Sequence, residues 1–181
     1  MLARSSAIGL FAAMALSLSS DSAPYFTLRS DGAVHLSVTG DEARYAIMPQ
    51  PYHGRPIISI SLGATQGDAA LLLFTYADEP LRPGRYPVAN ELPQAAFAGR
   101  RFHPCFIAGT VERPQGFFHG ESGWVTITAV EAKRIAGEYE IQARGFIAAD
   151  TANEDRWVTL RGSFGAQADS AVAGAQAASG S

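Results

Sequence analysis

The sequence has few of the residues on which several common architectures depend. Only one cysteine occurs in 181 residues, so an internal disulfide and a multi-cysteine metal site are both excluded. Charged residues make up 17% of the chain and hydrophobic residues 47%, a balance that excludes an intrinsically disordered chain. The formal net charge of −3 is not that of a charge-driven nucleic-acid binder.

Nucleotide-binding and hydrolase motifs are also missing. The chain has neither Gly-x-Gly-x-x-Gly nor the phosphate-binding pattern Gly-x4-Gly-Lys-Ser/Thr. Residues 120–123 read Gly-Glu-Ser-Gly, one residue short of the Gly-x-Ser-x-Gly turn of serine hydrolases. After the first twenty residues, no apolar stretch keeps the period of a helix. These patterns imply no cofactor.

The beginning of the chain has the features of a secretory signal peptide. Arg4 supplies a positive charge, and the apolar stretch from Ala7 to Leu18 has the length of a signal-peptide core. Small residues at positions 17 and 19 fit the cleavage rule. We expect residues 1–19 to form a signal helix that is removed, leaving a periplasmic or secreted protein. The apolar stretch is too short to serve as a stable membrane span, which needs about 20 residues.

The other end of the chain is poor in large side chains. Residues 166–181 are rich in Ala, Ser and Gly, and Val172 is the only large aliphatic residue among them. Such a segment buries too little surface to offset the entropy lost on ordering. The sequence therefore predicts a disordered tail over 166–181 and one folded domain over 20–165.

In the middle of the chain, apolar and polar residues alternate with a period of two. This period is typical of half-buried antiparallel strands, and the apolar positions that show it are Val34, Leu36, Val38, Ile58, Ile60, Leu62, Val125, Ile127, Ile135, Tyr139, Ile141, Val158, Leu160 and Phe164. Turn residues separate the runs. The sequence predicts an all-β protein, an antiparallel β-sandwich, with a closed lipocalin-like β-barrel as the alternative.

Three segments interrupt or vary this pattern. Residues 69–74 are apolar without a break, so we expect a central strand covered on both faces. Prolines in the segment Pro49–Pro56 predict a loop. The long irregular segment Ala89–Pro104 is the first place to look for a site, because long loops are disproportionately functional.

A recurring cadence in the sequence resembles that of small bacterial exported or lipid-anchored β-sandwich proteins of unassigned function. It begins with Pro-Gly-x-Tyr at residues 83–86 and continues with Gly-x-Val-x-Ile-Thr at 123–128. Ile-x-Gly-x-Tyr at 135–139 and Val-x-Leu-x-Gly-x-Phe at 158–164 complete it. The chain lacks the anchor cysteine of the lipid-anchored members. The resemblance implies a fold and a compartment, and no activity.

One set of side chains has the chemistry of a metal or thiol site. His103 and Cys105, and likewise His119 and Glu121, are two residues apart, which places each pair on one face of a strand. Imidazole, thiolate and carboxylate groups suit zinc, and a cysteine beside a histidine can act as a nucleophile. Pro104 and Gly120 disfavour regular strand at both places. We therefore keep a zinc-dependent or thiol enzyme only as an alternative.

Other candidate groups have ordinary structural explanations. Glu138 and Glu140 share one strand face, as do His35 and Ser37, and both pairs are expected in solvent rather than in catalysis. A local positive patch is predicted from the arginines at 82, 85, 100, 101 and 113, beside the aromatic residues Tyr86, Phe97, Phe102 and Phe106.

Together these patterns predict an exported, non-catalytic binding or structural protein of the bacterial envelope. Its partner is expected to be a protein, an envelope polymer or a small ligand, bound through loops, and not nucleic acid. A barrel-type carrier of a small apolar ligand is the second possibility, and an enzyme that uses His103, Cys105, His119 and Glu121 is the third. No catalytic, cofactor-binding or metal-binding residue is assigned.

Overall fold

The computed structural model describes residues 23–52, 55–63, 67–90, 100–110, 112–150 and 155–169. Over these residues the chain forms strands and turns and no helix. This part of the protein therefore contains no helix that is long and apolar enough to cross a membrane. The strands are β1 (Tyr25–Gly32), β2 (Leu36–Gly40), β3 (Ala43–Tyr52), β4 (Arg55–Leu62), β5 (Ala69–Tyr76), β6 (Gly84–Pro87), β7 (His103–Gly109), β8 (Pro114–Glu131), β9 (Arg134–Ile147) and β10 (Arg156–Ala168).

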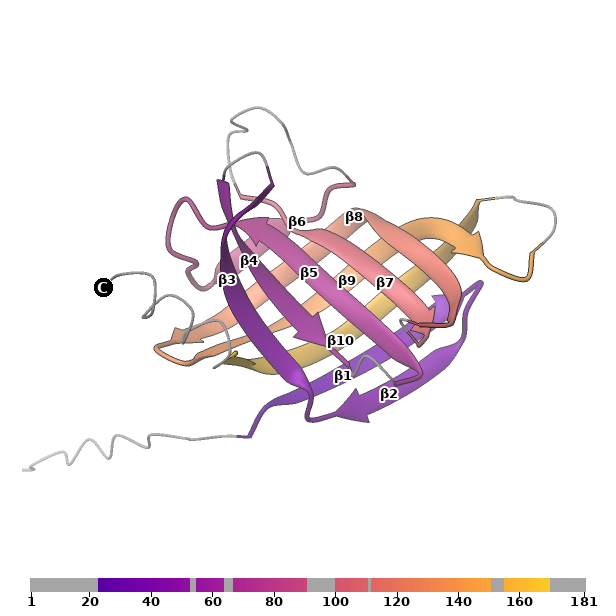
Figure 1. Ribbon diagram of the computed structural model, residues 1–181, viewed down its shortest axis with the longest axis horizontal. Helices are drawn as coiled ribbons and strands as arrows, with labels where there is room; N and C mark the ends of the chain where they lie inside the picture. Colours follow the sequence, from indigo (N-terminus) through magenta and orange to yellow (C-terminus); the bar gives the residue numbers. More distant parts are fainter. Residues whose placement is uncertain are drawn as a thin grey trace, which may run out of the picture.

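All ten strands belong to one sheet, and among them only the pair of β3 and β10 is parallel. The order of hydrogen-bonded neighbours is β2-β1-β10-β3-β4-β5-β7-β8-β6, while β9 pairs with both β8 and β10. The pairings therefore lead from β3 through β4, β5, β7, β8 and β9 to β10, and back to β3. Figure 1 shows the consequence: β3, β4, β5 and β7 cross in front of β8, β9, β10 and β1. The predicted all-β, antiparallel class is confirmed.

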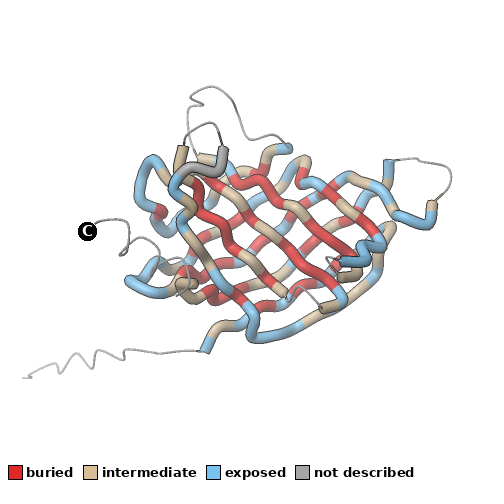
Figure 2. The backbone as a smooth tube through the Cα atoms, in the orientation of Figure 1, coloured by how far each residue is buried: buried red, intermediate tan, exposed pale blue. Residues whose placement is uncertain are grey.

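The interior between the front and rear strands is filled with side chains. Inward positions alternate with outward ones along most strands, as the banding in Figure 2 shows. The largest fully buried side chains are Phe102, Phe106, Phe118, Phe164, Leu28, Ile60, Leu62, Leu71, Leu73, Ile127, Ile141 and Leu160. Buried side chains from the front and rear strands thus form one hydrophobic core between them.

Strand β5 occupies the central position expected of residues 69–74. It lies between β4 and β7, and its inward residues Leu71 and Leu73 are fully buried. The outward residues Leu72 and Phe74 are half-buried. The unbroken apolar run thus reflects a strand whose outer face is also largely shielded from water.

Two predicted segments differ from the structure. The loop predicted within Pro49–Pro56 is wrong for residues 49–52 and 55–56, because β3 continues to Tyr52 and β4 begins at Arg55, while residues 53–54 lie outside the described residues. A register shift between Met48 and Tyr52 interrupts the ladder there. Prolines are tolerated where a strand pair is irregular, since their missing N–H groups break no regular ladder.

The folded part also extends further than predicted at its C-terminal end. Strand β10 continues to Ala168, and Ala166, the expected start of the tail, is fully buried. Small side chains did not prevent the segment from joining the sheet, because β9 and β3 supply backbone partners for it. The predicted signal helix at 1–19 and the remainder of the tail from 170 onward lie outside the described residues.

Candidate functional site

The site develops around a β-bulge in the long strand β8. Gly120 pairs with Ala143 of β9 and Ser122 pairs with Gln142, so Glu121 is an extra residue without a partner of its own. The bulge changes which residues point outward: Phe117 and His119 do so before it, and Ser122 and Trp124 after it. Two polar residues, Glu121 and Ser122, are therefore presented together on the outer face.

Glu121 is held by two partners from other elements. The side chain of Asn90 donates a hydrogen bond of 2.7 Å to Oε1 of Glu121, and Nε of Arg144 donates one of 3.0 Å to the same oxygen. Nη1 of Arg144 also donates to Asp155, at 3.2 Å. The guanidinium of Arg144 is thus fixed between two carboxylates, which orients the polar groups before any ligand arrives.

Aromatic side chains border this network. Phe117 contacts the imidazole of His119 edge-on, with ring centroids 4.8 Å apart, and lies 6.3 Å from Phe146 of β9. The guanidinium of Arg144 lies 6.0 Å from the ring of Trp157 in β10. Aromatic and charged groups together line a groove of about 350 Å³, which we call the Glu121 groove; its lining residues are Asn90, Phe117, His119, Glu121, Arg144, Gly145, Phe146 and Asp155.

A second hollow of about 510 Å³ adjoins the first on the same strands. It is lined by Arg85, Ser122, Gly123, Trp124, Glu140 and Gln142, and we call it the Trp124 groove. The guanidinium of Arg85 lies over the Trp124 ring at 4.2 Å. Gly123 allows the backbone of β8 to take its course beside Trp124. Its φ of 118° lies in a region that favours glycine, and a Cβ there would lie 2.2 Å from the carbonyl oxygen of Glu140.

The outer face of β8, β9 and β10 that carries both grooves is named the aromatic face, after Phe117, Trp124, Phe146 and Trp157. Three of these residues are highly exposed for residues in strands: 41% for Trp124 and 51% for both Phe146 and Trp157, while Phe117 is half-buried. Strand β9 is hydrogen-bonded to β8 on one side and to β10 on the other. Strand β8 is also bonded to β7 and β6, and β10 to β1 and β3. The face is thus the middle of a sheet and not its edge.

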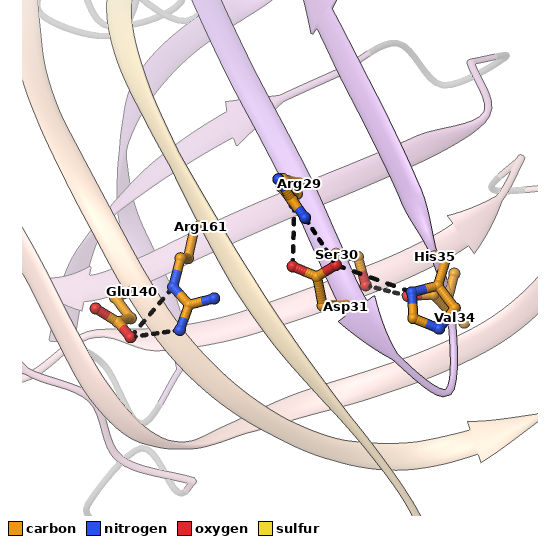
Figure 3. A network of polar contacts seen from close by, with 7 residues as sticks. All are labelled: Arg29, Ser30, Asp31, Val34, His35, Glu140 and Arg161. Atoms are coloured by element: carbon orange, nitrogen blue, oxygen red, sulfur yellow. Dashed lines mark hydrogen bonds and ion pairs between the residues drawn. The ribbon is translucent and has the colours of Figure 1, made fainter.

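Ion pairs continue the polar character of this face toward β1. Two nitrogens of Arg161 donate to Oε1 of Glu140, at 2.9 and 3.2 Å. Arg29 is the register partner of Arg161 and donates to Asp31, which holds the pKa of Asp31 below its usual value. Figure 3 shows the two pairs side by side, with His35 beyond Asp31. The predicted solvent position of Glu138 and Glu140 is confirmed.

The structure brings together part of the predicted metal or thiol set. Cys105 of β7 lies opposite His119 of β8, so the two segments do meet. Pro104 and Gly120 do not interrupt their strands, because Gly120 leaves the space that the Pro104 ring occupies; a Cβ would lie 2.6 Å from that ring. The expectation that these residues disfavour regular strand is therefore wrong for Pro104, whereas the ladder does become irregular directly after Gly120, at the bulge.

The four side chains nevertheless do not form a metal centre. Over the described ranges, no three His, Cys, Asp or Glu side chains lie close enough together to hold an ion. The Glu121 carboxylate is directed to Arg144 and Asn90, and His103 is buried, 6% exposed. The four-residue set is thus divided between two environments.

Burial also makes Cys105 and His103 poor catalysts. Desolvation raises the pKa of the Cys105 thiol to about 11, so the nucleophilic thiolate is scarce at neutral pH. Desolvation by burial lowers the pKa of His103 to about 4, although a hydrogen bond to the backbone of Ala89 opposes this. His103 is therefore neutral near pH 7, and its Nδ1 has no hydrogen-bond partner among the described residues.

The predicted arginine patch is not a single surface. Arg85 pairs with Thr126 in the second half of β8, whereas Arg113 immediately precedes the first residue of that strand. At about 3.3 Å per residue, the two are on the order of 40 Å apart along the strand. Arg100 instead donates a hydrogen bond to the backbone of Glu79. The aromatic residues Phe102 and Phe106 belong to the core, and Phe97 lies outside the described residues.

Sequence reasoning missed most of the aromatic face. No sequence motif gives a reason to select Trp124, Phe146, Trp157, Arg144 or Asp155, because each looks ordinary in its own segment. A usable signal was present: in the alternating pattern of β9 and β10, Arg144 and Trp157 occupy outward positions. Asn90 came from the irregular segment that was singled out, and it does border the same groove as Glu121.

No family model, curated protein or solved structure matches this chain.

Proposed function

We propose that the protein is an exported, non-catalytic binding protein of the bacterial envelope, periplasmic or secreted, and that the aromatic face is its binding surface. One observation carries the proposal: large aromatic rings remain in solvent around polar groups that are already fixed by ion pairs. Such a combination supplies apolar contact area and oriented hydrogen-bonding groups at a low entropic cost. Export is supported by the signal-peptide pattern of residues 1–19.

A non-catalytic role is favoured over the enzyme alternatives by the state of the candidate groups. A general acid needs a carboxyl group that holds a proton at the working pH, usually through desolvation. Glu121 instead lies at the surface of the Glu121 groove and accepts hydrogen bonds from Arg144 and Asn90. Cys105 is held as a thiol, as described above. None of these groups is prepared for proton or acyl transfer.

Export can be tested by itself. A fusion of the full chain to alkaline phosphatase, which is active only outside the cytoplasm, is expected to be active in a Gram-negative host. The same fusion without residues 2–19 is expected to be inactive. Equal activity of the two fusions would contradict export through the predicted signal.

Binding is tested by sedimentation of the purified protein with an insoluble envelope preparation from a Gram-negative bacterium. The wild-type protein is expected to sediment with it, and the double variant Trp124→Ala/Trp157→Ala is expected to stay in solution. Val130→Ala is the matched control, because Val130 is 39% exposed on β8 but lies beyond both grooves. Failure of the wild type to bind, or equal binding by the double variant, would overturn the proposal.

A further inference from the structure

Two tryptophans on the aromatic face are too far apart to form one apolar patch. Trp124 lies opposite Glu140 of β9, and Trp157 lies opposite Arg144, on the other side of β9 and four positions further along. Strand spacing and rise per residue place the Cα atoms of the two tryptophans about 16 Å apart. A single-ring molecule cannot contact both rings, whereas an extended chain of ring-shaped units can.

The surface between the tryptophans is polar and balanced in charge. Arg85, Arg144 and Arg161 supply positive charge, and Glu121, Glu140 and Asp155 supply an equal number of negative charges. Arg144 and Arg161 are paired with these carboxylates. This balance does not attract a polyanion such as nucleic acid, which is held by an excess of Lys and Arg. It suits a neutral ligand that both donates and accepts hydrogen bonds.

The position of the face within the sheet excludes one common mode of peptide binding. An extended peptide adds to the free edge of a sheet through its backbone. Strand β9, at the centre of the face, is paired with β8 and β10 along nearly its whole length. A ligand must therefore lie on top of the strands and contact side chains alone.

We propose that the aromatic face binds a neutral glycan chain, with one sugar ring on Trp157 and another on Trp124. Sugar rings present C–H groups on their flat faces, and these pack against the negative face of an indole ring. Their hydroxyl groups both donate and accept, so they can bind the carboxylate oxygens of Glu121 and Glu140 and the nitrogens of Arg144 and Gln142. This inference rests on the proposed binding function and names the chemical class of the ligand.

Native gel electrophoresis through soluble neutral polysaccharides tests this inference directly. The probes are dextran, a β-1,3-glucan, hydroxyethylcellulose and galactomannan, with alginate as the anionic comparison. We expect at least one neutral polymer to retard the purified wild-type protein and to shift its tryptophan fluorescence. Trp124→Ala and Trp157→Ala are each expected to weaken binding at least about tenfold. Trp157→Tyr should retain part of the affinity, since it keeps an aromatic ring, and Val130→Ala should retain all of it.

Three results would overturn the glycan inference. One is the absence of retardation by every neutral polymer; another is retardation by alginate alone. The third is a dimer in analytical ultracentrifugation that both tryptophan variants dissociate, since a second copy would then occupy the face. If envelope sedimentation still depends on Trp124 and Trp157 in any of these cases, the proposed binding function stands and only the glycan is wrong. If envelope sedimentation is absent as well, both fail.

Discussion

The outer faces of the front and rear halves of the sheet are built by the same alternation and differ in chemistry. On the rear half, the outward residues of β8, β9 and β10 are polar or aromatic and mostly exposed, and they include ion pairs. On the front half, the outward residues of β5 and β7 are apolar, or titratable groups that burial keeps neutral; they are Ala70, Leu72, Phe74, His103, Cys105 and Ile107. The strand period determines which side chains point outward, and their surroundings determine whether they can interact with a ligand.

The largest expected effect comes from the residue that shapes the rear face. Gly123→Ala is expected to lower the free energy of unfolding by about 3 kcal/mol, because it combines an unfavourable backbone conformation with a steric clash. Gly123 has a φ of 118°, and the new Cβ would lie 2.2 Å from the carbonyl oxygen of Glu140. Urea unfolding measures the change. Ser122→Ala, at the exposed neighbouring position, should alter stability by less than about 0.5 kcal/mol. Similar values for both variants would contradict the backbone conformation and the close approach described for Gly123.

A second prediction concerns the buried histidine of the front face. The pKa of His103 falls from 6.5 in the unfolded chain to about 4 in the folded protein. Between these values the unfolded chain binds more protons, so stability is lost as the pH falls from about 6.5 toward 4. Between pH 7 and pH 5 this loss amounts to about 2 kcal/mol.

The variant His103→Leu should lack this part of the pH dependence, since leucine fits an apolar site and does not titrate. Thermal melts at pH 7 and pH 5 measure the difference between the variant and the wild type. His119→Leu is the matched control, because it makes the same substitution at an exposed histidine of the neighbouring strand β8. A wild-type pH dependence that survives in His103→Leu would show that another group is responsible.

The smallest effect is expected for an ion pair of the rear face. Arg161→Gln breaks the ion pair with Glu140. Because the side chain of Arg161 is 53% exposed and that of Glu140 is 63% exposed, the free energy of unfolding should change by less than about 0.5 kcal/mol. Its effect on binding to the aromatic face should be the larger one, because the pair orients Glu140 beside the Trp124 groove. A loss of more than about 1 kcal/mol in urea unfolding would assign the pair to the stability of the fold instead.

Much of the fold was accessible from local patterns. Strands with apolar residues on one face, such as those containing Ile58 and Ile60 or Val158 and Leu160, were predicted because each carries its own period. The first half of β8 was not predicted as a strand, because glycines occupy two of its inward positions where apolar side chains would show the alternation. Gly116 lies against Phe118 and Gly120 against Pro104, so the inward contacts are supplied by neighbours. Strand β7 was missed because both of its faces are largely buried.

The candidate site was less accessible, and the reason is register. Cys105 and His119 were placed in one candidate set by their chemistry, but whether they pair depends on how β7 aligns with β8. The partnership of Glu121 with Arg144 and Asn90 needs the bulge in β8 as well as the arrangement of two further segments. Small slips in any of these alignments would place the same residues apart.

The sequence by itself determined that this chain forms antiparallel strands with an apolar interior, because alternation is a property of neighbouring residues. It also determined that the chain contains one cysteine, neither of the two nucleotide-binding motifs and no excess of positive charge. Only the tertiary structure decided that Trp124 and Trp157 share a surface with fixed ion pairs, while Cys105 and His103 are withdrawn from water. Contacts of this kind join residues from distant strands, and they follow from register and sheet curvature, which no local pattern specifies.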